Sequence, residues 1–271
     1  MPIGATSYVF RYLLSESSRS LRLNELVRMA RAAGLERFQI CENARPLDLD
    51  CSGWAQLNEQ AQELGLHLTL GCMTLDPQIV TEYLDRVQVI GGNSLRIVLE
   101  RDGPAFLTEH QIRSFLDSVA PLLESRGIKL AIENHFEIPA KLLAESVEPY
   151  PRELIGFCID AANSLRNFED SNRVFDLLGH RAVAFHLKDF QLSGNNVGFT
   201  VSGAPFGDGQ IGAPQLLERV FAVSSEPEIY LETWTPSTGN REIDIDTDSN
   251  WLRLSIENLK RNLLQLQHSR R

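Results

Sequence analysis

The sequence predicts a single α/β domain, spanning residues 1–271, that closes into a (β/α)8 barrel. A unit of helix, glycine and short apolar strand recurs along the chain, and eight candidate strands can be counted. The length of 271 residues suits one such barrel. An open doubly wound sheet is the competing interpretation, but no glycine-rich dinucleotide fingerprint opens the first unit, which weakens it.

The recurring unit is clearest at five places. A helical segment ending in glycine leads to an apolar strand in "RMARAAG–LERFQICEN", "NEQAQELG–LHLTLGCM", "DRVQVIGG–NSLRIVLE", "APLLESRG–IKLAIENH" and "VFDLLG–HRAVAFHLKD". Glycine just past a helix end supplies the left-handed residue that closes the helix. The strands are apolar on both faces, as parallel strands covered by helices must be.

Further elements complete the predicted barrel. Apolar strands are expected at 3–8, 155–160 and 228–234, and an amphipathic helix at 251–266 closes the chain. A capping box at 108–111 and the pair Asp76–Pro77 mark two helix starts. Residues 191–212, rich in Gly, Ser and Asn, are predicted to be the longest irregular stretch, and such loops are commonly functional.

The composition narrows the class of partner. The formal net charge of −10 repels phosphate backbones, so general nucleic-acid binding is not expected. No apolar stretch approaches ~18 residues, so no membrane partner is predicted. The N-terminus lacks the features of a signal peptide, and the four cysteines form no C-x-x-C pair. A cytoplasmic location is the resulting expectation.

Polar residues end four successive predicted strands. Glu133 lies in "AIENH", Asp160 in "FCID", His186 in "FHLKD" and Glu232 in "YLETW". Strand alternation can turn all four toward the barrel mouth, where the carboxylates would repel one another. A divalent cation resolves this repulsion. Mn²⁺ is preferred and Mg²⁺ also suits the ligands, while Co²⁺ and Zn²⁺ remain open. One polar strand end alone could simply cap a helix, but four together indicate a metal site.

The motifs "AIENH", "FCIDAAN", "FHLKD" and "YLETW", in this order, resemble the sugar phosphate isomerase/epimerase family, also called xylose isomerase-like TIM barrels. "GDGQIG" at 207–212 resembles the glycine-rich turn after strand seven of that family. The resemblance implies that Glu133, Asp160, His186 and Glu232 bind one divalent metal.

This sequence departs from the family pattern at several positions, and these departures indicate which branches of the family it resembles least. The endonuclease branch uses several metals and more histidines than this chain offers. The ketose 3-epimerases typically carry a histidine where this sequence has Asn163, and an arginine shortly after the strand-seven histidine. Here Lys188 stands two residues after His186 instead, a form more like the dehydratases.

The resemblance implies an isomerase or epimerase that acts on a keto-sugar or sugar derivative through an enediolate. Glu133 and Glu232 are then the catalytic base and acid. The alternative is a lyase, either decarboxylase or dehydratase, of a polyhydroxy keto acid that uses the same intermediate. A barrel that only binds a sugar is a third interpretation, which the two glutamates argue against. The partner is a small keto-sugar or sugar acid, and homo-oligomer formation stays open.

Lys188 is the best clue to the substrate. It shares a strand face with His186, and a buried ammonium group needs an anionic partner. A substrate carboxylate, phosphate or enediolate would serve, and so would Asp189 or a metal-binding carboxylate. Asp189 points to the opposite face and is expected to brace a neighbouring strand or loop. The other expected substrate-binding residues are His135, Asn163 and Trp234.

Overall fold

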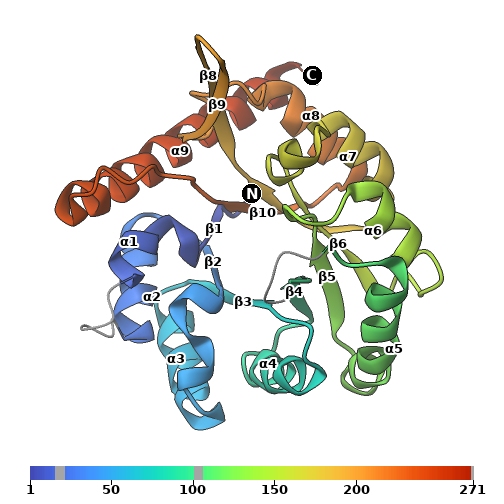
Figure 1. The fold of residues 1–271 in the computed structure, drawn as a ribbon. Coiled ribbons are helices and arrows are strands. Elements are labelled where there is room, and N and C mark those ends of the chain that lie inside the picture. Colours follow the sequence, from blue (N-terminus) through green and yellow to red (C-terminus); the bar gives the residue numbers. More distant parts are fainter. Residues whose placement is uncertain (16–21, 101–105, 270–271) are drawn as a thin grey trace.

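The structure, a computed structural model, describes residues 1–15, 22–100 and 106–269. Eight parallel strands close into one barrel, in which each strand pairs with its predecessor and β10 pairs with β1 (Figure 1). The barrel strands are β1 (Gly4–Thr6), β2 (Arg37–Ile40), β3 (His67–Met73), β4 (Ser94–Val98), β5 (Lys129–Glu133), β6 (Ile155–Asp160), β7 (Ala182–Leu187) and β10 (Glu228–Leu231). The predicted (β/α)8 fold is confirmed, and each predicted strand forms.

Helices surround the barrel (Figure 1). Buried apolar residues of most of these helices pack with those of the strands in one core cluster. The α-helices are α1 (Arg11–Leu14), α2 (Leu23–Ala32), α3 (Cys51–Glu63), α4 (Pro77–Val89), α5 (Glu109–Arg126), α6 (Ala140–Val147), α7 (Ser171–Leu178), α8 (Ala213–Val223) and α9 (Arg241–Ser269). Short 3₁₀ helices are η1 (Ser7–Phe10), η2 (Glu42–Ala44), η3 (Pro46–Asp48), η4 (Asn163–Asn167) and η5 (Gly179–Arg181). Within the described ranges, no helix combines the length and apolarity that a membrane crossing requires.

The two predicted helix starts form, and four of the five predicted helix-closing glycines take up that role. Asp76 caps α4 and the Thr108 capping box opens α5. The four glycines after α2, α3, α4 and α5 have φ between 63° and 88°, as left-handed closing residues do. Gly179 does not, since its φ is −56°. There the chain continues directly into η5, and the glycine instead gives room to Val223, whose Cγ1 would lie 3.0 Å from an added Cβ.

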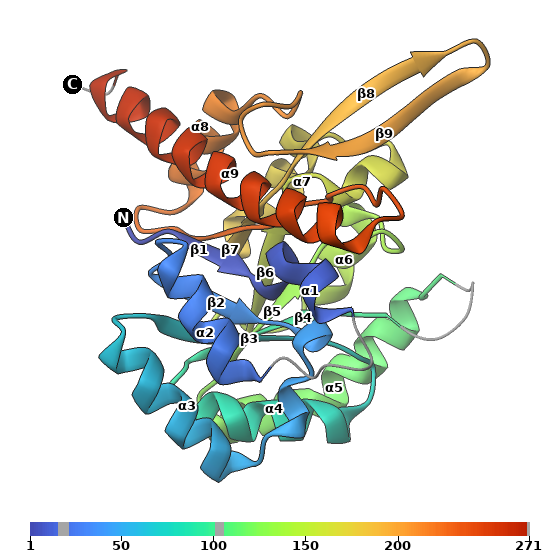
Figure 2. The same cartoon turned by 90° about the vertical axis from the view of Figure 1, so that its left-hand side faces the viewer.

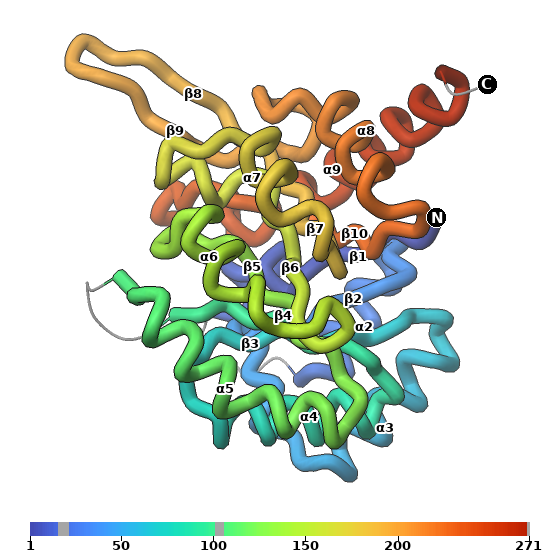
Figure 3. Tube along the Cα trace, turned by 90° about the vertical axis from the view of Figure 1, so that its right-hand side faces the viewer, coloured from blue at the N-terminus to red at the C-terminus, as the bar shows by residue number. Residues whose placement is uncertain are grey.

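The prediction of an irregular stretch over residues 191–212 is wrong for its first half. β8 (Asp189–Asn195) and β9 (Gly198–Ala204) form an antiparallel hairpin that projects from the barrel (Figures 2 and 3). Leu192 pairs with Val201, and Gly194 pairs with Phe199. Apolar residues therefore alternate with polar ones along both strands, a period-2 pattern that the many Gly, Ser and Asn residues concealed.

The last helix begins ten residues before the amphipathic segment 251–266 that the sequence predicted. α9 starts at Arg241, because its first turns bury acidic rather than apolar side chains. Asp244 accepts hydrogen bonds from Ser237 and Thr238, and Asp248 accepts one from the backbone N–H of Tyr12. Hydrogen bonding replaces apolar packing there, so a search for hydrophobic periodicity misses this part of the helix.

Asp189 braces the glycine-rich turn beside the end of β7, the role expected from its strand face. Its buried carboxylate accepts hydrogen bonds from the backbone N–H groups of Phe190, Gly207, Gly209 and Ile211 at 2.8–3.1 Å. A Cβ at Gly209 would lie 2.1 Å from Asp189 Oδ1, so only glycine allows this approach.

Asp189→Ala is expected to lower the free energy of unfolding by about 3 kcal/mol, because it leaves several buried N–H groups without acceptors. Ser193→Ala, on the exposed part of β8, is the control and should change it by less than about 0.5 kcal/mol. Urea denaturation measures both. A loss below about 1 kcal/mol in the Asp189 variant would show that the turn does not depend on this carboxylate.

Candidate active site

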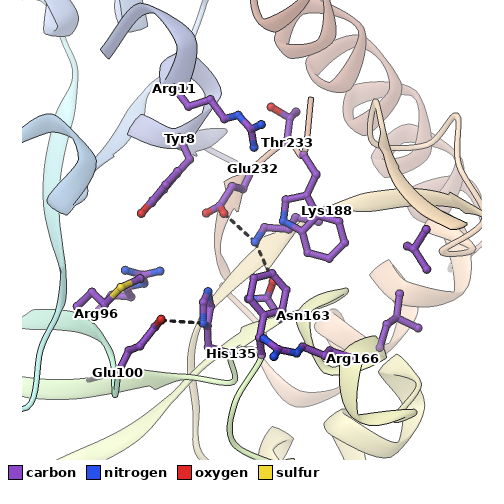
Figure 4. A pocket seen from close by; sticks show the side chains of 15 residues that line it. Tyr8, Arg11, Arg96, Glu100, His135, Asn163, Arg166, Lys188, Glu232 and Thr233 are labelled. Carbon is purple, nitrogen blue, oxygen red and sulfur yellow. Dashed lines mark hydrogen bonds and ion pairs between the residues drawn. The ribbon is translucent and has the colours of Figure 1, made fainter. Parts of the chain in front are cut away.

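A cavity of about 720 Å³ opens at the carboxyl ends of the barrel strands (Figure 4). The predicted substrate-binding residues all line it, as does one of the two predicted catalytic glutamates: His135, Asn163, Lys188, Trp234 and Glu232. The remaining predicted metal ligands, Glu133, Asp160 and His186, are buried beside it. The strands thus gather the sequence-predicted residues at one end of the barrel.

The three predicted carboxylate ligands are joined through two basic side chains, those of His186 and Lys188. His186 Nδ1 lies 3.1 Å from Glu133 Oε2 and 3.3 Å from Glu232 Oε2. Lys188 Nζ lies 3.0 Å from Asp160 Oδ2. The same atom lies 2.7 Å from Glu232 Oε1 (Figure 4). All five side chains are buried, so their charges interact with little screening by water.

The imidazole of His186 is oriented by a residue on the far side of the barrel. Its Nε2 lies 2.9 Å from Oε1 of Gln39, a buried residue of β2. A carbonyl oxygen can only accept, so Nε2 carries the proton and, in the neutral ring, Nδ1 holds the free lone pair. Nδ1 faces the glutamates. Glu133, Cys158 and His186 each place a ligand atom within 4.8 Å of the others.

The side chain of Asn163 lies between Glu133 and Lys188 and forms a hydrogen bond with each. Its Nδ2 donates to Glu133 Oε1 at 2.8 Å, and its Oδ1 accepts from Lys188 Nζ at 3.1 Å. Its backbone N–H donates to Asp160 Oδ1 at 2.8 Å, which places it at the start of η4, directly after β6. An asparagine at this position can therefore support both a carboxylate and an ammonium group.

His135 and Trp234 lie further from the cluster and shape the cavity. His135 Nδ1 is 3.4 Å from Glu100 Oε2, and burial lowers the pKa of this histidine to about 4, so the ring is neutral at pH 7. The ring of Trp234 lies with its centroid 5.1 Å from Lys188 Nζ, close enough for a cation–π contact.

Arg96 is the main residue of the site that sequence reasoning missed. It is buried in β4, and its Nε donates to Glu133 Oε2 at 2.5 Å. Its Nη1 donates to Glu42 Oε2 at 3.2 Å, and Glu42 also accepts from Tyr8 Oη at 2.7 Å. The signal was present, since an arginine interrupts the apolar run "SLRIVLE" just as His186 interrupts its own strand.

Neighbouring cations keep the two glutamates ionised despite their burial. Burial alone would raise the pKa of Glu133, but Arg96 and His186 outweigh it and hold this pKa well below its usual range. Burial likewise opposes ionisation of Glu232, but Lys188 and His186 lower its pKa. Both groups are therefore carboxylates at neutral pH.

The neighbouring negative charges also shift the pKa values of Lys188, His186 and Asp160. Burial disfavours the charge of Lys188, yet Asp160 and Glu232 raise its pKa above the usual value. Burial also opposes the charge of His186, but Cys158 and Glu133 raise its pKa. For Asp160, burial raises the pKa, and Lys188 only partly offsets this. The cluster thus attracts positive charge and resists further negative charge.

The donor set fits a divalent cation. Four carboxylates of the cluster, those of Glu42, Glu133, Asp160 and Glu232, face only two permanent cations, Arg96 and Lys188. With His186 neutral and Asp160 ionised, as metal ligands are, the excess is two negative charges, which a divalent ion would neutralise. Within the described residues, neither Asp160 Oδ2 nor His186 Nδ1 has a well-directed hydrogen bond, although both atoms are buried. Hard oxygen donors and one imidazole nitrogen suit such an ion.

The fold and this site define a barrel enzyme with an acidic, metal-compatible centre. The model of the xylose isomerase-like TIM-barrel family matches residues 27–255, and the chain belongs to this family. The 3-oxo-isoapionate decarboxylase of Pectobacterium atrosepticum is 25% identical over 262 residues, which cover 96% of this chain and 95% of the relative.

Solved structures show the same barrel at low identity. A xylose isomerase domain protein from Planctomyces limnophilus has a TM-score of 0.73 at 13% identity, over 89% of this chain and 93% of its own. The D-psicose 3-epimerase of Clostridium cellulolyticum H10, solved with D-tagatose, has a TM-score of 0.70 at 13% identity, and the match covers 99% of each chain. A xylose isomerase-like TIM-barrel protein from Mycobacterium smegmatis, in complex with magnesium, has a TM-score of 0.68 at 10% identity. The match covers 95% of this chain and 97% of that protein.

The depressed pKa of Glu232 predicts how acid affects the metal-free protein. A carboxylate whose pKa is lowered on folding stabilises the fold above its unfolded pKa of about 4.3, and this stabilisation is lost as the pH falls further. The free energy of unfolding should therefore decline below about pH 4.5, by up to ~1.4 kcal/mol per pH unit for each such group. Glu232→Gln should flatten this decline, whereas Glu109→Gln, on the exposed surface of α5, should not. Equal slopes in all three proteins would contradict the assignment.

Proposed function

We propose that this enzyme is a divalent-metal-dependent lyase that removes CO₂ from a polyhydroxy keto acid. The observation that carries the proposal is Lys188, a buried ammonium group that lines the cavity beside the carboxylate cluster. Its charge is matched by Asp160 and Glu232 as the structure stands. Once a divalent ion neutralises those carboxylates, the ammonium needs a new anion, and a substrate acid supplies one.

The ligands in this proposal are Glu133, Asp160, His186 and Glu232, with Mn²⁺ as the preferred ion. A divalent ion held there supplies Lewis-acid stabilisation of negative charge on a carbonyl oxygen. Gln39 fixes the ring of His186 with Nδ1 toward the site, and Arg96 holds Glu133. Such supporting contacts commonly set ligand orientation in metal sites.

The reaction needs a carboxylate on the carbon next to the ketone. The bond between that carbon and the carboxylate breaks, CO₂ leaves, and the electron pair passes into an enediolate whose charge lies on the former carbonyl oxygen. Lys188 and the amide of Asn163 lie where they can stabilise this charge. No base is required for this step.

The carbon is then protonated to give the neutral keto-sugar. Glu232 lines the cavity, so we assign it the transfer of a proton from solvent to that carbon. Glu133 has both oxygens engaged, Oε1 by Asn163 and Oε2 by Arg96, and acts in positioning and charge stabilisation. The similarity to a decarboxylase over nearly the whole chain supports this reaction class.

Isomerisation or epimerisation of a keto-sugar is the second candidate, and the placement of the two glutamates favours it. Both lie within 3.3 Å of His186 Nδ1, so two carboxylates flank one point beside the cavity, an arrangement that could supply a base and an acid. A neutral sugar, however, gives Lys188 no anion to bind. The cytoplasmic location remains a prediction from the sequence, and homo-oligomer formation stays open.

Product analysis in D₂O separates the two candidates. The Mn²⁺-loaded enzyme is incubated with a panel of 3-keto aldonates and with the corresponding ketoses, and CO₂ release is measured alongside ¹H NMR and mass spectra. The proposal predicts CO₂ and one carbon-bound deuterium per product, with a rate at least ~100-fold lower in Glu232→Gln. Deuterium incorporation with no loss of mass would instead establish the second candidate. Absence of both would overturn the shared enediolate chemistry.

A further inference from the structure

Four cationic side chains line the cavity, and one of them differs from the rest. Arg96, Arg166 and Lys188 each form an ion pair with a glutamate or aspartate: Glu42 and Glu133, Glu137, and Asp160 and Glu232 respectively. Arg11 contacts no carboxylate at ion-pair distance among the described residues. Its Nη2 donates instead to the neutral hydroxyl of Tyr12 at 2.8 Å.

The guanidinium of Arg11 is nevertheless held in place. It stacks over the ring of Tyr12, with Cζ 4.7 Å from the ring centroid. Tyr12 is itself fixed, because its hydroxyl donates to the carbonyl of Thr235 at 2.7 Å and its backbone N–H donates to Asp248. The side chain extends from α1 to the cavity rim near Thr233 and Glu232 (Figure 4).

Nearby acids on α9 do not take the place of a partner. The charge of Arg11 acts on both Asp244 and Asp248, but it does not set the pKa of either one. Burial raises the pKa of Asp248, and hydrogen bonds from Thr238 and Ser237 outweigh burial and lower the pKa of Asp244. Asp244 accepts from Ser237 and Thr238. Asp248 accepts from the backbone N–H of Tyr12 through Oδ2, while its buried Oδ1 accepts no well-directed hydrogen bond from Arg11 or any other described group. A rigid guanidinium with unused donors therefore faces a cavity of substrate size.

We propose that Arg11 is a specificity-determining residue that binds the carboxylate of an acidic substrate at the cavity rim. This inference rests on the proposed function, and it names a second residue, besides Lys188, that selects sugar acids over neutral sugars. A fixed guanidinium can present two parallel N–H donors to a carboxylate, which a neutral sugar cannot match.

The position of Arg11 also predicts its kinetic role. The negative charge of the carboxylate is lost as CO₂ forms, so an ion pair with it does not strengthen in the transition state. Arg11 should therefore contribute mainly to substrate binding. Its replacement is expected to raise KM for a keto acid about tenfold and to leave kcat within about twofold.

Calorimetric binding to the Mn²⁺-loaded protein tests the inference without requiring turnover. Aldonates of four to six carbons are compared with ketoses of the same length. The wild-type protein should bind the aldonates at least about tenfold more tightly. Arg11→Gln should remove this preference by weakening aldonate binding, with ketose binding unchanged within about twofold, and Arg11→Lys should be intermediate.

Arg28→Gln is the matched control, because it removes the same charge from the exposed face of α2 and should keep the preference. Thermal unfolding of each variant confirms that the fold is retained. The inference fails if the wild-type protein prefers ketoses. It also fails if Arg11→Gln weakens both ligand classes equally, as loss of a purely structural contact with α9 would.

The two proposals fail separately. A protein that selects aldonates through Arg11 but releases no CO₂ keeps this inference and loses the decarboxylation. A protein that releases CO₂ while Arg11→Gln binds aldonates as the wild-type protein does shows the reverse.

Discussion

The excess of buried negative charge at the barrel mouth is the constraint on which the site depends. Glu133, Asp160 and Glu232 are nearly inaccessible to water, and carboxylates in that state are costly unless paired. Lys188 and Arg96 provide this pairing, with their nitrogen atoms 2.5–3.0 Å from the carboxylate oxygens. These two cations do not balance all of the buried carboxylates, and the remaining negative charge favours the binding of a divalent ion.

The barrel makes this arrangement possible because alternation along each strand turns chosen residues inward. Asp160 and His186 are direct neighbours in the register of β6 and β7, and Tyr230 pairs with His186 two residues before Glu232. Each polar group therefore reaches the mouth on a rigid strand, while the apolar residues before it fill the barrel. Asp189, one residue beyond Lys188, points the other way and anchors the glycine-rich turn.

The sequence predicted the barrel and the gathering of the four acidic and histidine residues, because strand periodicity and strand ends are local features. Arg96 and Gln39 escaped prediction since their roles depend on contacts across the barrel. Arg96 meets Glu133 from 37 residues away, and Gln39 meets His186 from 147. Arg11 gave no signal, because an arginine after a strand is ordinary until a cavity is seen beside it. The hairpin of β8 and β9 was missed since its glycines and serines resemble those of a loop.

These contacts also explain how one metal-compatible centre can serve different reactions within a family. In the proposed reaction, a divalent ion held by the acidic cluster would stabilise the enediolate, and Lys188 and Arg11 would select an acidic substrate. The central claim is that the cluster lacks two positive charges and that Lys188 supplies part of the compensation. Calorimetric titration of the metal-free protein with Mn²⁺ tests it most directly. One equivalent should bind to the wild-type protein, and Lys188→Met should bind it about tenfold more tightly, because a competing cation is removed. Lys141→Met, on the exposed surface of α6, should match the wild-type protein. No Mn²⁺ uptake by the wild-type protein, or unchanged or weaker binding by Lys188→Met, would contradict the account.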